Sequence, residues 1–150
     1  MYDDEIKKLE ELSNGLKRIN GKIKLLSLLR QAKAEYDENN YDGCTETCKK
    51  ILETNSDNAI ALRGLGCVAQ SQGDFKNALK YYKKALKTSL NKEIEYTLIG
   101  NLYYLEDKFD KAIDINDNYD SAYEGRNQSM LEKHLQIVDL QDNLIKREMF

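Results

Sequence analysis

The residues with the clearest chemical potential are the cysteines and the single histidine. Cys44 and Cys48 lie four residues apart, which places both thiols on one face of a helix, where they could share a metal ion. No second pair of Cys or His completes a tetrahedral site, and His134 has no companion for acid-base chemistry on its helix face. A glycine-rich phosphate loop and a Ser-His-Asp order are also missing. We therefore predict no catalytic residue, no metal and no cofactor, and an enzyme is the disfavoured class.

The composition predicts that helices must position whatever site the chain has. It contains 20 Leu, 2 Val, 8 Gly and no Pro. Leu favours helix, whereas β-branched residues favour strands and Pro interrupts helices by removing a backbone N–H. With 41% hydrophobic and 33% charged residues in 150, the chain can bury a core of ordinary size. The predicted fold class is all-α.

Charge and hydropathy exclude two kinds of partner. The formal net charge is -3, so a dedicated binder of the nucleic-acid phosphate backbone is not expected. No apolar run reaches the roughly 18 residues of a membrane-spanning helix. The opening residues, MYDDEIKKLEE, lack the cationic start and apolar block of a secretory signal, and an odd number of cysteines suits a reducing compartment. We expect a cytoplasmic protein that binds neither nucleic acid nor membrane.

The helical pattern recurs at a spacing of 34 residues. This shift places Gly66 on Gly100, Phe75 on Phe109 and Ala78 on Ala112. In the opposite direction it places Cys44 at the position of Ala78, so Cys44 and Cys48 are predicted to be buried packing residues. Each copy is predicted to be a helix, a tight turn and a second antiparallel helix, in which the small residues permit close approach of the two helices. The turns fall at Asn39-Asn40, Gly73-Asp74 and Asp107-Lys108, and polar breaks between copies fall at 55–58 and 116–118.

The best copy resembles the tetratricopeptide-repeat family. Its signature positions hold Leu62, Leu65-Gly66, Ala69, Ala78, Tyr82 and Leu90, with the run Tyr81-Tyr82-x-x-Ala85-Leu86. Ala69 replaces an aromatic residue, and the closing Pro of the family is missing. The resemblance covers residues 25–126 and implies a right-handed superhelical solenoid of about three repeats. The repeats would span 25–58, 59–92 and a third copy over 93–119 that is seven residues short, followed by the start of a fourth.

Both flanks carry apolar stripes at helical spacing. In residues 1–24 and just beyond, the spacing alternates between three and four residues, as in a coiled-coil seam. The residues of this stripe are Leu9, Leu12, Leu16, Ile19, Ile23 and Leu26. We expect residues 1–24 to form a cap on the first repeat, with self-association as the alternative. Residues 120–150 are predicted to form one long capping helix whose apolar width could also accommodate a partner or a second subunit.

The resemblance implies that function resides in the concave groove lined by the first helix of each repeat. The partner-binding residues predicted by register are Lys33, Tyr36, Arg63, Gln70, Thr97, Asn101 and Tyr104, with Leu29 and Cys67 beside them. Such a mixed surface could hold an extended peptide or an amphipathic helix of another protein. The carboxylate clamp of chaperone-binding family members is absent, since Leu29, Cys67 and Thr97 occupy three of its positions. The alternatives are a homo-oligomeric assembly subunit and a bacterial secretion-type chaperone.

Overall fold

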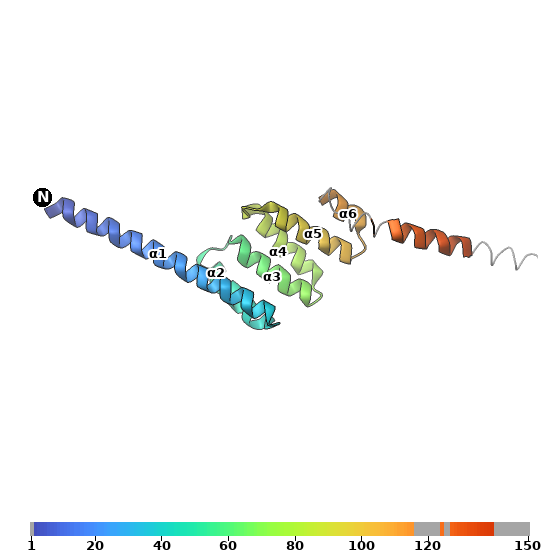
Figure 1. The fold of residues 1–150 in the computed structure, drawn as a ribbon, viewed down its shortest axis with the longest axis horizontal. Helices are drawn as coiled ribbons and strands as arrows, with labels where there is room; N and C mark the ends of the chain where they lie inside the picture. The colour runs from blue at the N-terminus through green and yellow to red at the C-terminus, as the bar shows by residue number, and fades with distance from the viewer. Residues whose placement is uncertain (1, 116–123, 125–126, 140–150) are drawn as a thin grey trace, which may run out of the picture. The chain divides into compact units, whose positions relative to one another are not determined.

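The structure is a computed structural model that describes residues 2–115, 124 and 127–139. Throughout these ranges the chain consists of helices and turns, without strands, as Figure 1 shows. Six helices have defined bounds. They are α1 (Tyr2–Asp37), α2 (Tyr41–Thr54), α3 (Ala59–Ser71), α4 (Phe75–Thr88), α5 (Lys92–Leu105) and α6 (Phe109–Ile115). The all-α helix-turn-helix repeat fold predicted from the sequence is confirmed.

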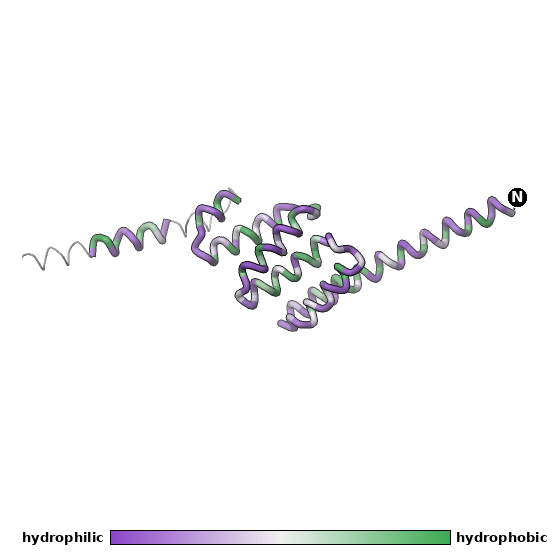
Figure 2. The backbone as a smooth tube through the Cα atoms, turned by 180° about the vertical axis from the view of Figure 1, so that it is seen from behind, coloured by the Kyte–Doolittle hydropathy of each residue, from purple (hydrophilic) through white to green (hydrophobic). Residues whose placement is uncertain are grey.

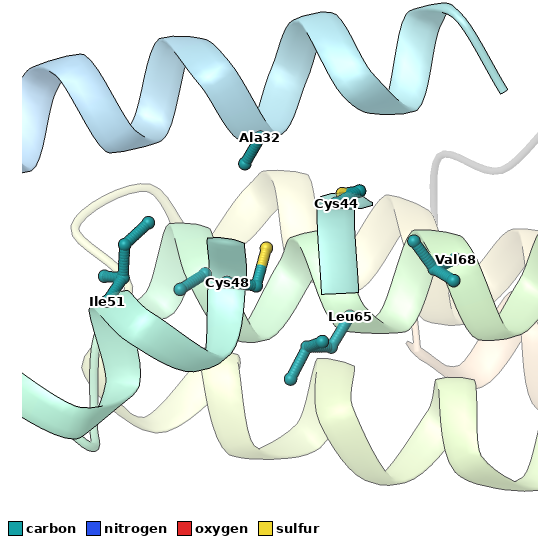
Figure 3. Close-up of a cluster of buried hydrophobic side chains, with 7 residues drawn as sticks. Ala32, Cys44, Cys48, Ile51, Leu65 and Val68 are labelled. Atoms are coloured by element: carbon teal, nitrogen blue, oxygen red, sulfur yellow. The ribbon is translucent and has the colours of Figure 1, made fainter. Parts of the chain in front are cut away.

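The first unit, Met1–Leu90, contains two helix pairs. Each helix packs on the next one in the chain, and α1 also packs on α3. Figure 3 shows Ala32 of α1 pointing toward Cys44 and Cys48 of α2, with Leu65 and Val68 supplied by α3. Both cysteines are only 1% exposed, which confirms that they are packing residues. This shared cluster holds the two pairs together through apolar burial.

Close approach of α3 and α4 depends on Gly66. A Cβ atom built there would lie 2.6 Å from Cδ1 of Tyr82 and closer still to Cε1. The Tyr82 ring is fully buried, and its hydroxyl donates a hydrogen bond of 2.8 Å to Oε1 of Gln70. The prediction that Gly66 permits close packing of its helix pair is therefore confirmed.

The three turns within the pairs share one backbone conformation. Asn39, Gly73 and Asp107 have φ angles of 61°, 79° and 58°, in the left-handed region. In each turn the next amide donates a 2.8 Å hydrogen bond to the carbonyl five residues earlier: Asn40 to Glu35, Asp74 to Ala69 and Lys108 to Tyr103. This is the Schellman arrangement that ends a helix. The three residues with positive φ are therefore 34 residues apart, which is the spacing of the sequence repeat.

The starts of α2, α3 and α4 are capped by polar residues of the predicted turns and of the predicted break at 55–58. The side chains of Asn40, Asn58 and Asp74 accept hydrogen bonds from the amides of Gly43, Ala61 and Asn77, at 3.1, 3.0 and 3.2 Å. Each bond satisfies an amide that has no partner within its helix. The break at 55–58 separates α2 from α3, whereas the one predicted at 116–118 lies outside the described residues.

The N-terminal flank is part of a single helix with the first repeat. α1 runs unbroken through residue 24, where the sequence placed a domain boundary, and in Figure 1 its N-terminal half extends beyond the other helices of the first unit. Figure 2 shows that hydrophobic residues recur at intervals along this mostly hydrophilic helical segment. Three acidic residues in the first turn, Asp3, Asp4 and Glu5, favour a helix start here through the helix dipole.

The second unit, Asn91–Phe150, contains α5 and α6, which pack against each other. Ala112 and Ile113 of α6 are buried with Tyr103 of α5 against them. The structure describes α6 over Phe109–Ile115, and the end of the predicted third copy, 116–119, lies outside the described residues. Residues 127–139 are helical, while the remainder of the predicted capping helix lies outside the described residues.

Candidate functional site

A groove of about 510 Å³ lies between α1 and α3 in the first unit. Its apolar wall and floor come from three helices. The residues are Leu26, Leu29 and Ala32 of α1, Cys44 and Cys48 of α2, and Ile60, Ala61, Gly64 and Cys67 of α3. Since α1 and α3 are the first helices of the two repeats, this groove has the location that the family resemblance implies.

Small residues keep the floor of the groove open and rigid. Ala32 and Ala61 are buried where the helices meet. A Cβ atom at Gly64 would lie 2.8 Å from Sγ of Cys48, so α3 can approach α2 this closely only because residue 64 lacks a side chain. The floor is consequently a packed surface of methyl groups, methylenes and thiols.

The polar rim is dominated by cations. Arg30, Lys33, Tyr36 and Asp37 of α1 and Arg63 of α3 line the groove with their side chains. Lys33 donates to Oδ2 of Asp37 at 2.6 Å, and both side chains are more than half exposed, so this ion pair adds little stability. Three cations and one carboxylate give the rim a formal charge of +2 in a chain whose net charge is -3. The rim therefore favours a ligand that carries carboxylates.

Hydrogen bonds fix α1 relative to α2 and α3 beside the groove. Near the C-terminal ends of α1 and α3, the hydroxyls of Tyr36 and Ser71 are 2.8 Å apart. The buried Thr47 of α2 donates to Oε2 of Glu35 on α1 at 2.8 Å, and Gln31 of α1 donates to the Thr47 hydroxyl oxygen at 3.3 Å. These bonds limit sliding of the helices, so the groove is largely pre-formed.

The thiols around the groove are structural. Burial raises the pKa of Cys44, and burial together with the neighbouring thiol of Cys44 raises the pKa of Cys48 to about 12. Both groups therefore remain protonated and unreactive at neutral pH. Burial also raises the pKa of Tyr82, which lies next to Cys67. In the described ranges no three Cys, His, Asp or Glu side chains come together as a metal site.

Three of the seven residues predicted to bind a partner, Lys33, Tyr36 and Arg63, line this groove. Gln70 lies on α3 but accepts the hydrogen bond of Tyr82, so its amide oxygen is used within the repeat. Thr97, Asn101 and Tyr104 are on α5, in the second unit, where the Thr97 hydroxyl donates to the carbonyl of Glu93 at 2.8 Å. The structure thus brings together three of the four residues predicted on the first two repeats.

Sequence reasoning missed Leu26, Arg30, Asp37 and Ile60 as lining residues. A signal was present, because Leu26, Arg30 and Lys33 follow each other at spacings of four and three and so share a helix face. The sequence interpretation assigned Leu26 to the N-terminal stripe alone.

Comparison with known proteins identifies one repeat. Residues 59–89, which comprise α3, α4 and the following residue, match the family model described as Tetratricopeptide repeat. This match confirms the tetratricopeptide repeat that the sequence predicted for the best copy. A search of curated proteins found none that matches the chain. No helix within residues 2–115, 124 and 127–139 is both long and apolar enough to cross a membrane.

Proposed function

Since the chain carries a tetratricopeptide repeat, we propose that it is a protein-binding scaffold whose groove between α1 and α3 holds a segment of another protein. Repeats of this family generally mediate protein-protein interaction, typically without enzymatic activity. The observation that carries the proposal is an apolar floor bordered by a cationic rim in one pre-formed groove.

The chemistry of the groove defines the class of ligand. Leu26, Leu29 and Ile60 offer apolar surface, and Ile60 is 53% exposed, so a partner that covers it gains hydrophobic free energy. Arg30 and Arg63 approach from opposite walls, so carboxylates flanking an apolar side chain would find a cation on each side. The proposed ligand is an acidic amphipathic segment, as an extended peptide or a helix.

The residues predicted on the second unit extend this proposal. Thr97, Asn101 and Tyr104 lie on α5, the first helix of the third repeat, in the register that Lys33 and Arg63 occupy in theirs. We propose that they bind a segment of a partner protein on the second unit. The three free thiols suit the cytoplasmic location that we propose for the interaction.

Peptides selected from a display library on the wild-type protein provide the test, with their affinity measured by fluorescence polarisation. Arg63→Glu reverses a rim charge and Ile60→Asp places a charge on the apolar wall, and each should weaken binding by about tenfold or more. Lys83→Glu on α4 is the matched control, because Lys83 is exposed and does not line the groove. Circular dichroism confirms that the variants remain folded.

Retained affinity in both groove variants would contradict the proposed site. Selection of peptides without acidic residues would contradict the proposed ligand chemistry while leaving the groove as the site. Asn101→Ala extends the test to the second unit: reduced affinity supports its participation, and unchanged affinity confines the ligand to the first unit.

A further inference from the structure

Between residues 9 and 26, α1 presents an apolar stripe that the other helices of the first unit leave more than half exposed. In the described part of the chain, the six residues of this stripe remain between 54% and 65% exposed. They are Leu9, Leu12, Leu16, Ile19, Ile23 and Leu26. A stripe of large apolar side chains over this length is far more than a lone surface helix needs, and it marks an interaction surface.

The spacing identifies the stripe as a coiled-coil seam. Leu9, Leu16 and Ile23 fall at the first position of successive heptads and Leu12, Ile19 and Leu26 at the fourth. The same two positions hold Tyr2 and Glu5 before the stripe, and Arg30 and Lys33 after it. The seam therefore continues into the α1 wall of the groove, with one acidic end and one basic end.

We propose that α1 pairs antiparallel with α1 of a second copy of this chain, centred between residues 17 and 18. In this register, the residue numbers of two facing residues, one from each copy, add up to 35. Leu16 then packs on Ile19 of the second copy, Leu12 on Ile23, and Leu9 on Leu26. Glu5 faces Arg30, and Tyr2 lies on the Lys33 side chain.

Charge decides the orientation. A parallel, in-register pair would place Glu5 against Glu5, Arg30 against Arg30 and Lys33 against Lys33, with like charges at three seam layers. In the antiparallel pair, Glu5 instead faces the oppositely charged Arg30, and Lys33 faces the uncharged Tyr2. The flanking charges agree: residues 3–11 contain five acidic and two basic side chains, whereas residues 17–33 contain six basic ones and no acidic one.

The register is decided by the same residues. Sliding the antiparallel pair by one heptad would place the Glu5 carboxylate against Ile23, and Lys8 would approach Lys22 of the second copy. Centring at 17–18 instead places every apolar seam residue on another apolar one. Gly15, beside the seam, has no atom within 4 Å of an added Cβ, which leaves room for the partner helix.

Analytical ultracentrifugation tests the pairing. The wild type should sediment as a dimer, and Leu16→Glu should weaken association by at least about 100-fold. Asn14→Glu is the matched control, because Asn14 lies on the opposite face of α1 and should leave the dimer intact. Arg63→Glu on α3 should also leave it intact. Arg30 and Lys33 belong to both the seam and the groove rim, so Leu16, which is only in the seam, and Arg63, which is only in the groove, separate this proposal from peptide binding.

Charge exchange tests the orientation. Glu5→Arg should weaken the dimer by about tenfold, and adding Arg30→Glu should restore it, because the pair is then reversed. In a parallel dimer, residues 5 and 30 would each face the same residue of the second copy, so like charges would still meet in every variant. Oxidation of Leu9→Cys mixed with Leu26→Cys should yield the mixed disulfide, whereas Leu9→Cys alone should give no dimer beyond the wild-type background.

Three outcomes would overturn the proposal. They are a wild-type monomer at every concentration, an intact dimer in Leu16→Glu with unchanged helicity, and self-linking of Leu9→Cys. A monomer would indicate that the stripe is covered by a different partner.

Discussion

Replacing Gly66 with Ala tests whether helix packing or helix propensity governs the repeat. In an exposed helix, this substitution stabilises by up to about 1 kcal/mol because Ala restricts the unfolded chain. At residue 66, however, the new methyl group would overlap the Tyr82 ring, 2.6 Å from Cδ1. The ring has no space to retreat, since it is fully buried and its hydroxyl is bonded to Gln70.

The expected magnitude follows from these opposing effects. Forcing an additional methyl group into a packed core costs about 1–3 kcal/mol. Loss of the Tyr82–Gln70 hydrogen bond would add about 1 kcal/mol if the ring is displaced. Subtracting the gain in propensity leaves a net loss of about 2 kcal/mol in the free energy of unfolding. Urea denaturation followed by circular dichroism should show a lower midpoint with an unchanged slope.

The chain provides its own control and its own compensation. Gly21, on the exposed part of α1, has no atom within 4 Å of an added Cβ, so Gly21→Ala should increase helicity without loss of stability. In the first repeat, Ala32 and Cys48 occupy the positions of Gly66 and Tyr82. Gly66→Ala in a Tyr82→Cys background should therefore be neutral or stabilising. An equal cost of Gly66→Ala in both backgrounds, or no cost in either, would refute the packing argument.

Two further predictions concern pH and turn geometry. Burial raises the pKa of Cys48 from 9.0 to about 12, so the unfolded chain loses this proton first, and stability should fall as the pH rises from 9 towards 12, by on the order of 1 kcal/mol at pH 10. Urea titrations at pH 7 and pH 10 in reductant measure the fall, and a Cys48→Ala variant with an equal fall would contradict it. Gly73→Ala should cost about 1 kcal/mol because φ is 79° there, whereas Asn39→Gly should be neutral or slightly stabilising. Thermal melting compares the stabilities of the two variants. A lower melting temperature for Asn39→Gly than for Gly73→Ala would show that the left-handed conformation is not strained for residues other than Gly.

Part of the site was predictable because it depends on register. The position of each groove residue on its helix is fixed by 3.6 residues per turn, and the 34-residue spacing identifies equivalent helices. Lys33, Tyr36 and Arg63 were found in this way. Gln70 shares that register, yet its amide oxygen accepts a hydrogen bond from the Tyr82 hydroxyl. Register gives the helix face of Gln70, but it does not give the distance to Tyr82, which decides whether the amide is available to a ligand.

The sequence by itself determined the helix pairs of the repeats, the turns within them and their buried positions. Local chemistry is sufficient for these features: Asn and Asp side chains cap helix starts, Gly or Asn adopts positive φ at helix ends, and small residues recur where helices cross. Composition likewise determined the all-α class, since Leu is abundant and Pro is absent.

Only the tertiary structure decided that α1 is one helix from residue 2 to 37 and that its apolar stripe joins the groove. A sequence stripe does not reveal whether a helix folds back or continues, because both arrangements use the same periodicity and differ only in long-range contacts. The cationic rim likewise required two helices to meet, since Arg30 and Arg63 are 33 residues apart in sequence. Burial and electrostatic fields depend on such distant neighbours, which act through space and not along the chain.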